Sequence, residues 1–119
     1  MPAMQISGVG IDVVEVARFR LLVKQKKQHL LAKIFSDIEQ AYCFSYADAA
    51  PHFAGTFAAK EAVQKALGDF SLPLVLLEIR RQKSGKPEVW IKGFRSKSLL
   101  ISISHTFDIA CAMVFKQKQ

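Results

Sequence analysis

The segment from Gly55 to Gly68 constrains the fold more than any other part of this 119-residue chain. Its small side chains recur with the period of an α-helix, which predicts a helix that starts near Asp48–Pro51 and ends before Gly68. Because small side chains let backbones approach closely, we expect this helix to pack tightly against a sheet. The stripe predicted to face the sheet consists of Ala58, Ala59, Ala62, Val63, Ala66 and Leu67, and the opposite side carries Phe57, Glu61 and Lys65.

Alternation of apolar and other residues predicts a strand over residues 5–14. In this strand Val9, Ile11 and Val13 share one face, and Asp12 lies on the other. The pattern then becomes helical over residues 15–33.

A capping box formed by Ser36 and Glu39 predicts the start of another helix, which should end near Tyr46. The rest of the chain alternates as strands do, with a Gly-Pro turn at residues 83–87. The order strand, three helices, four strands predicts an α+β fold, and the length fits one domain over residues 1–119. The four later strands are expected at residues 74–81, 88–91, 99–104 and 109–115, the last as an antiparallel return.

The net charge of +7 is concentrated in two basic blocks, residues 15–33 and residues 80–97. Such blocks attract polyanions: nucleic acid, anionic lipid, a phosphorylated ligand or an acidic protein. A simple solubilising surface is the alternative. The pattern matches no recognised nucleic-acid-binding module, so an acidic protein or a phosphorylated ligand fits the charge at least as well.

Several absences indicate a cytoplasmic protein with no membrane partner. No apolar run approaches the roughly 20 residues that are needed to cross a bilayer. Residues 1–5 lack the basic and apolar regions of a signal peptide. Cys43 and Cys111 lie in unrelated contexts, which favours buried thiols in a reducing compartment over a disulfide or a metal site.

Two carboxylates, Asp12 and Glu61, are candidate magnesium ligands. Magnesium commonly takes one or two carboxylates and completes its shell with water and substrate phosphates. If the strand and the helix meet, the pair would suit chemistry at a phosphate ester, with Lys65 nearby to neutralise charge. The alternatives stay open from the residues alone: Asp12 can be solvated on a half-buried strand, and Glu61 can form a surface ion pair with Lys65 at i, i+4.

His105 is in phase with the apolar residues of its strand, whereas Ser104 and Thr106 point the other way. A lone histidine in this setting is often a core residue, and that alternative stays open. The segment has no nucleophile elbow, and the chain has neither a P-loop nor a dinucleotide-binding fingerprint. A Ser-His-Asp hydrolase is therefore not indicated.

Taken together, four segments resemble the holo-acyl-carrier-protein synthase group of 4'-phosphopantetheinyl transferases. Each is weak alone, but their order and spacing across almost the whole chain are specific. The fold implied is an antiparallel-rich sheet packed against a long helix, with additional N-terminal helices. The segments are Gly8–Glu15, Phe57–Ala62 followed by Lys65, Gly85–Pro87 and Ser102–Thr106.

This resemblance implies transfer of the 4'-phosphopantetheine arm of coenzyme A to a serine of apo acyl carrier protein. The reaction is magnesium-dependent, releases adenosine 3',5'-bisphosphate and serves fatty acid biosynthesis. Asp12 and Glu61 match the family's metal ligands, and Lys65 matches the lysine that approaches the phosphates. Coenzyme contacts are implied for Gly85, Lys86, Pro87, Ser104, His105 and Thr106, with the 3'-phosphate near His105 and Thr106.

The resemblance also implies an acidic carrier protein docked on the first helix, at Arg18, Lys24, Lys26 and Lys27. The family's short members are homotrimers with sites between subunits, so Gly85–Pro87 would come from a neighbouring chain. Three segments depart from the family pattern: Thr56 replaces a common arginine, Gly68–Ser71 replaces a Gly-Thr-Gly loop, and residues 93–98 are short for the usual helix. Thr56 and the missing glycine loop motivate the alternative of a catalytically degenerate member that binds carrier protein or nucleotide.

Overall fold

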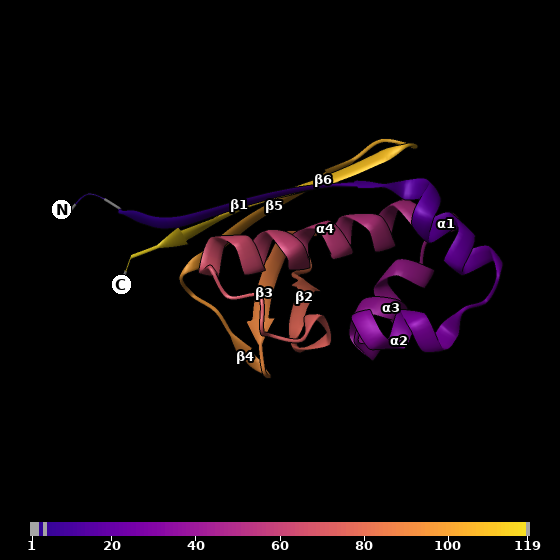
Figure 1. The fold of residues 1–119 in the computed structure, drawn as a ribbon, viewed down its shortest axis with the longest axis horizontal. Helices are drawn as coiled ribbons and strands as arrows, with labels where there is room; N and C mark the ends of the chain where they lie inside the picture. Colours follow the sequence, from indigo (N-terminus) through magenta and orange to yellow (C-terminus); the bar gives the residue numbers. More distant parts are fainter. Residues whose placement is uncertain (1–2, 4, 119) are drawn as a thin grey trace.

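The computed structural model describes residue 3 and residues 5–118. The prediction about a signal peptide at residues 1–5 therefore falls mostly outside the described residues. A long helix, α4 (Ala50–Leu67), runs along one face of a three-stranded antiparallel sheet (Figure 1). This sheet has the strand order β1 (Ile6–Glu15), β6 (Ile109–Gln117), β5 (Leu99–His105). The α+β architecture agrees with the sequence-based prediction.

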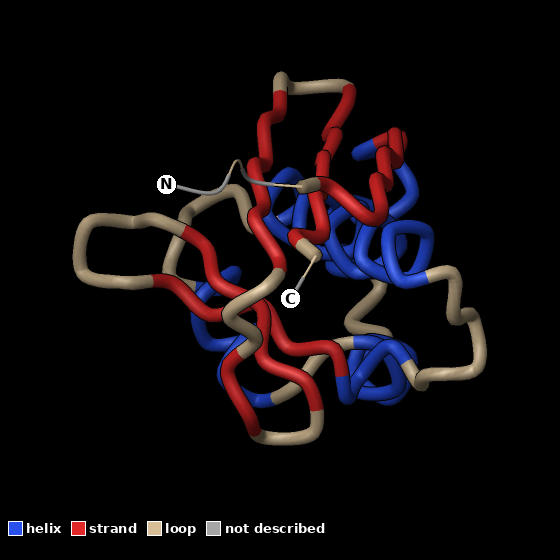
Figure 2. Tube along the Cα trace, turned by 90° about the vertical axis from the view of Figure 1, so that its left-hand side faces the viewer, coloured by secondary structure: helices blue, strands red, loops and turns tan. Residues whose placement is uncertain are grey.

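A second antiparallel sheet contains β2 (Leu77–Arg81), β3 (Pro87–Ile91) and the short β4 (Phe94–Arg95). Figure 2 shows the two sheets as separate groups of strands with helices behind them. The predicted strand over 74–81 is wrong at its start. Residues Leu74–Leu76 form a 3₁₀ turn, η1, in which Leu76 N–H donates to the carbonyl of Pro73 at 3.0 Å. The hairpin formed by β2 and β3 agrees with the prediction.

The helix predicted over residues 15–33 is in fact two helices, α1 (Val16–Lys24) and α2 (Gln28–Ile34). Lys26 adopts a left-handed conformation with φ 53°. The N–H of Lys27 donates to Leu22 O and that of Lys26 to Val23 O, the two bonds of a Schellman motif. Periodicity alone did not reveal this break because no glycine or proline marks it.

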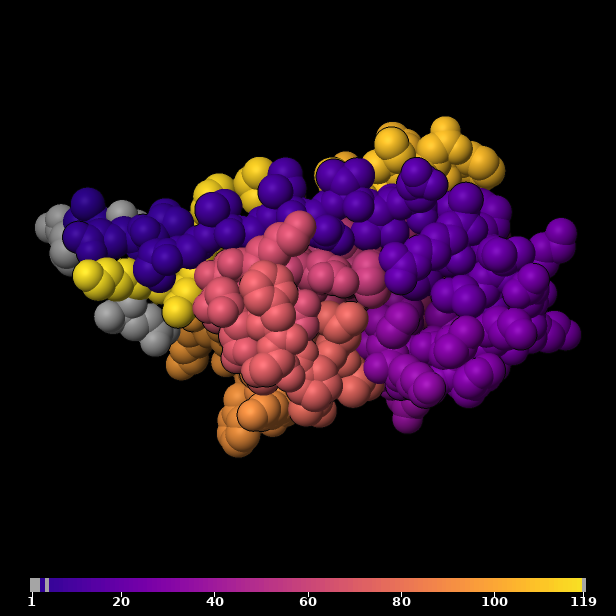
Figure 3. Space-filling view, in the orientation of Figure 1, coloured from indigo at the N-terminus to yellow at the C-terminus, as the bar shows by residue number. Residues whose placement is uncertain are grey.

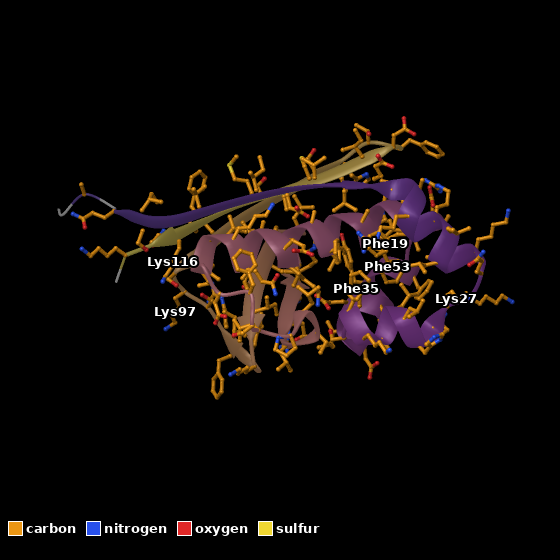
Figure 4. The ribbon with its side chains drawn as sticks, in the orientation of Figure 1. Phe19, Lys27, Phe35, Phe53, Lys97 and Lys116 are labelled. Carbon is orange, nitrogen blue, oxygen red and sulfur yellow. The ribbon has the colours of Figure 1, made fainter. Side chains whose placement is uncertain are left out.

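The break turns α2 back toward the body of the protein, where three phenylalanines pack. Phe35 lies 5.8 Å from Phe19 and 4.9 Å from Phe53 between ring centroids, both edge to face. Figure 4 shows the three rings grouped where α1 meets α4. In Figure 3, residues 16–44 are gathered at one end of the molecule. This cluster fixes α1 and α2 against α4.

The capping box predicted at Ser36 is present and begins α3 (Asp37–Phe44). Ser36 Oγ accepts from Glu39 N–H at 3.3 Å, and Glu39 Oε1 accepts from Ser36 N–H at 2.9 Å. Glu39 is itself buried and also accepts from Ile79 N–H at 2.8 Å. The cap therefore joins α3 to β2.

Helix α4 is buried on nearly all sides, not only along the predicted small-residue stripe. Phe57, which was expected opposite that stripe, is buried, and its ring centroid lies 5.3 Å from that of Phe19. On the sheet side, Gly8 and Gly10 of β1 lie against the backbone of Ala62 and Ala66. The apolar side chains of Val9, Ile11 and Val13 accordingly point away from α4. The face of β1 that carries Asp12 is the one packed against the helix.

Candidate active site

Strand β1 and helix α4 form a cleft of about 540 Å³ that contains three residues singled out in the sequence. Asp12 enters it from the packed face of β1. Glu61 and Lys65 enter it from successive turns of α4. Arg18 and Phe57 complete one side. The close approach of β1 to α4 is what brings these side chains, which are distant in sequence, to one place.

Lys65 pairs with Asp12 and not with Glu61. Its Nζ donates to Asp12 Oδ1 at 3.1 Å and to the carbonyl of Ile11 at 2.8 Å. The Asp12 side chain is only 18% exposed, so its charge is balanced by a lysine instead of by bulk water. Both alternatives left open by the sequence, a solvated Asp12 and a Glu61–Lys65 surface pair, disagree with this geometry.

The chemistry of the donors in the cleft fits magnesium. Within the described part of the chain, no group of three or more His, Cys, Asp or Glu side chains could hold a metal ion. Asp12 and Glu61 provide two carboxylates, which is what magnesium takes when water and phosphate oxygens complete its shell. The pair would therefore hold a magnesium ion together with a phosphorylated ligand.

A basic surface begins at the rim of this cleft. The guanidinium of Arg18 lies over the Phe57 ring at 4.8 Å and beside the Phe19 ring at 5.5 Å. Lys24, Lys26 and Lys27 are exposed at and after the end of α1. Figure 4 shows Lys27 projecting from the helical end of the molecule. An acidic partner bound along α1 would reach the cleft at Arg18.

His105 and Thr106 line a second cleft, of about 490 Å³, at the start of α4. His105 meets His52 of α4 there, with 5.0 Å between ring centroids. Thr106 Oγ1 accepts from the N–H groups of Asp108 and Ile109 at 3.3 and 3.2 Å, so this hydroxyl caps the β5–β6 turn. Ser104 lies on the opposite face of the sheet, pairing with Cys111, and does not line this cleft.

His52 and Thr56 show how α4 is built beside the second cleft. Burial lowers the pKa of His52, and the nearby His105 and Arg81 lower it further. Asp48 has a smaller effect and raises it. Hydrogen bonds from Arg20, at 2.7 and 2.9 Å, lower the pKa of Asp48. Thr56 is buried and donates to the His52 carbonyl at 2.8 Å. His52 carried no motif in the sequence.

The Gly85–Pro87 turn is separate from both clefts. Gly85 has φ +92°, and its N–H donates to Gln82 O at 2.8 Å to close the turn. Lys86 and Pro87 line a hollow of about 280 Å³ beside β5. Within one chain this hollow shares no lining residue with the cleft of Asp12 and Glu61.

No sequence pattern predicted the buried ion pair between Lys60 and Glu39. Lys60, next to Glu61, is fully buried and pairs with Glu39. Its Nζ also donates to the carbonyls of Ile34 and Leu74 at 2.7 and 2.8 Å. Burial raises the pKa of Glu39 and lowers that of Lys60, in opposition to their mutual attraction. These bonds tie α4 to α2, α3 and η1 at the turn that carries Glu61.

Among the described helices, none is long and apolar enough to span a bilayer. The model of the 4'-phosphopantetheinyl transferase superfamily matches residues 8–114. The holo-[acyl-carrier-protein] synthase of Thermodesulfovibrio yellowstonii is 44% identical over 110 residues, covering 92% of this chain and 96% of that protein. That of Chlamydia caviae is 41% identical over 117 residues, with the same coverage of 92% and 96%.

Solved structures of holo-acyl-carrier-protein synthases share the fold. The Bacillus anthracis enzyme, in complex with CoA (3',5'-ADP), has a TM-score of 0.79 and 28% identity, covering 98% of this chain and all of the other. The Helicobacter pylori enzyme, in complex with coenzyme A, has a TM-score of 0.77 and 31% identity, covering 92% and 99%. The chain thus belongs to the 4'-phosphopantetheinyl transferase superfamily and is an enzyme of its holo-[acyl-carrier-protein] synthase group.

Proposed function

We propose that this enzyme transfers the 4'-phosphopantetheine arm of coenzyme A to a serine of an apo acyl carrier protein, in the cytoplasm and for fatty acid biosynthesis. The observation that carries the proposal is the shared cleft of Asp12, Glu61 and Lys65 between β1 and α4. A diphosphate needs a cation and positioned donors, and this cleft has both a carboxylate pair for the cation and an ammonium group.

Asp12 and Glu61 are the residues that would hold Mg²⁺, which when bound neutralises negative charge on the diphosphate of coenzyme A. Lys65 is already oriented by Ile11 O and Asp12 Oδ1, so its ammonium can donate to a phosphate oxygen without a large rearrangement. The packing of β1 on α4 holds all three groups in one place, which is the main contribution a protein makes to phosphoryl transfer.

The reaction forms a bond between the serine hydroxyl oxygen and the phosphorus that bears the pantetheine arm. The bond from that phosphorus to the oxygen bridging to the adenosine 5'-phosphate breaks. The hydroxyl proton passes to the carboxylate of Glu61, directly or through one water molecule. The bridging oxygen leaves on adenosine 3',5'-bisphosphate, and Lys65 stabilises its negative charge.

The basic surface of α1 supports docking of an acidic carrier protein. Arg18 lines the reaction cleft, and Lys24, Lys26 and Lys27 extend the positive charge along and beyond the helix. A carrier protein bound here would present its serine at the rim near Arg18. This surface accounts for the first basic block without invoking nucleic acid.

We further propose a homotrimer with shared sites. The outer face of the first sheet is apolar and exposed: Val9, Ile11 and Val13 of β1 are 56%, 53% and 63% exposed. Burying these side chains against another copy would stabilise the assembly. It would also allow Lys86 and Pro87 of one chain to complete the Asp12–Glu61 cleft of its neighbour. Sedimentation velocity measures the assembly, and a monomer at micromolar concentration would contradict it.

Mass spectrometry of an apo carrier protein incubated with coenzyme A and Mg²⁺ tests the function. We expect the phosphopantetheine mass with the wild type and none with Asp12→Ala or Glu61→Ala, whose circular dichroism should be unchanged. Asp37→Ala, an exposed carboxylate outside both clefts, is the control and should transfer normally. Tight binding of coenzyme A without any transfer by the wild type would instead support the degenerate alternative. Full activity of Asp12→Ala or Glu61→Ala would refute the metal assignment.

A further inference from the structure

The second cleft brings together two imidazoles from distant parts of the chain. His52 lies in the first turns of α4, and His105 ends β5, with 5.0 Å between ring centroids and 73° between ring planes. Both line the same cleft of about 490 Å³, together with Tyr46, Thr106 and Phe107. His52 has no part in the reaction proposed above, so its position calls for a separate explanation.

The His52 ring contacts three other rings, those of Tyr42, Tyr46 and His105, which fix its orientation. Tyr46 stacks on it with 3.6 Å between centroids and 12° between planes. The Tyr46 hydroxyl in turn lies 3.3 Å from that of Tyr42. Within residues 5–118, no side-chain hydrogen bond satisfies a ring nitrogen of either His52 or His105. An oriented ring whose nitrogens are unpartnered is ready to donate to a ligand.

The surroundings of His52 favour an anion. Arg81 lies over the Tyr42 ring at 4.7 Å. Burial lowers the pKa of His52 most, and His105 and Arg81 lower it further. Asp48, the carboxylate that lines this cleft, is held in a two-bond pair with Arg20 at 2.7 and 2.9 Å. The uncompensated charge near the two rings is therefore positive. A bound dianion would relieve that repulsion and accept the ring N–H bonds.

His52 and Pro51 line the cleft from the first turn of α4. Thr56, one turn further on, is 2% exposed, and its hydroxyl donates back to His52 O at 2.8 Å. Its Oγ1 lies 3.8 Å from Cys43 Sγ, so it faces α3. Thr56 does not line the cleft, whereas His52 does.

We propose that His52 is a substrate-specificity residue: with His105 it binds the 3'-phosphate monoester of coenzyme A, and Tyr46 positions its ring. This inference rests on the proposed function. The diphosphate occupies the Asp12–Glu61 cleft in that function, so the 3'-phosphate is the remaining anionic group of the substrate. Recognition of that phosphate distinguishes coenzyme A from its 3'-dephospho form.

The transfer assay with coenzyme A and with 3'-dephospho-coenzyme A tests the proposal. His52→Ala should raise KM for coenzyme A about tenfold or more, since it removes a hydrogen bond to a charged group. KM for the dephospho form and kcat for both should change by less than about twofold. His29→Ala, an exposed histidine of α2, is the matched control and should change neither KM. An equal effect of His52→Ala on both substrates would overturn the proposal.

Tyr46 provides a second test of the same idea. Tyr46→Phe keeps the stacked ring and should preserve the preference for coenzyme A, whereas Tyr46→Ala should weaken it. Calorimetry with adenosine 3',5'-bisphosphate and with AMP measures the same preference without turnover. Suppose that the wild type transfers nothing, but that it prefers adenosine 3',5'-bisphosphate to AMP and His52→Ala loses that preference. The proposed function would then be refuted and the phosphate site would stand. A preference unaffected by His52→Ala would refute the phosphate site.

Discussion

The contact between Gly10 and α4 makes a strong prediction about both stability and activity. A Cβ added at Gly10 would lie 1.9 Å from the carbonyl oxygen of Ala62 and 2.9 Å from the amide nitrogen of Ala66. Ordinary van der Waals contact begins at 3.4 Å, so β1 and α4 would have to separate by about 1.5 Å, 3.4 less 1.9. The obstacles are backbone atoms of a helix, which cannot rotate away.

We therefore expect Gly10→Ala to lower the free energy of unfolding by about 3 kcal/mol or more, at the upper end of the overpacking range. Alanine also lowers the conformational entropy of the unfolded chain, which offsets less than about 1 kcal/mol of this loss. Because β1 carries Asp12 and α4 carries Glu61, the separation should also misplace the two carboxylates. A shift of this size costs on the order of 100-fold in rate.

Urea denaturation at one fixed protein concentration and the phosphopantetheine transfer assay measure the two effects. Gly55→Ala is the matched control, because its Cβ would meet only the methyl group of Ile103 at 3.0 Å. Its better helix propensity offsets that contact, so the net change should stay within about 1 kcal/mol. If Gly10→Ala were as stable and active as the wild type, β1 would not pack on α4 in this register, and the site geometry would be refuted.

Three further predictions concern the stability of the fold. Lys60→Met should cost about 3–5 kcal/mol in urea denaturation because it leaves Glu39 buried without its partner, and adding Glu39→Gln should recover part of that loss; equal stability of the single and double variants would contradict this. Lys26→Gly should raise the melting temperature, since glycine accepts the φ of 53° without strain, and a lower value would argue against the Schellman turn. Burial raises the pKa of Cys43 to about 12, so the folded state keeps its proton where the unfolded thiol, with a pKa of about 8.5, has lost it. Stability should therefore fall as pH rises above roughly 9, and Cys43→Ala should reduce that slope; an unchanged slope would exclude the thiol as its source.

Local sequence patterns were sufficient where one residue type has a local physical consequence. The Ser36–Glu39 capping box, the glycine stop after Leu67 and the turn at Gly85 all appear where predicted. The Schellman break at Lys26 was missed because a non-glycine residue in the left-handed region leaves no local mark. The start of β2 was missed because the apolar residues 74–76 suit a 3₁₀ turn as well as a strand.

The candidate site divides in the same way. The sequence identified Asp12, Glu61 and Lys65 as a possible set, but periodicity could not say which face of β1 is packed. Apolar side chains normally indicate the buried face, and here Val9, Ile11 and Val13 indicated the exposed one. The glycines on the other face leave room for the helix, which reverses that expectation.

By itself the sequence determined the class of fold, the family resemblance and the residues with the right chemistry, because motif identity and spacing are local properties. Only the tertiary structure decided which of them meet. It paired Lys65 with Asp12, joined Lys60 to Glu39 and brought His52 to His105. These contacts link residues from 21 to 53 positions apart, and they depend on how closely β1, α3 and β5 approach α4. No pattern within one segment specifies that approach.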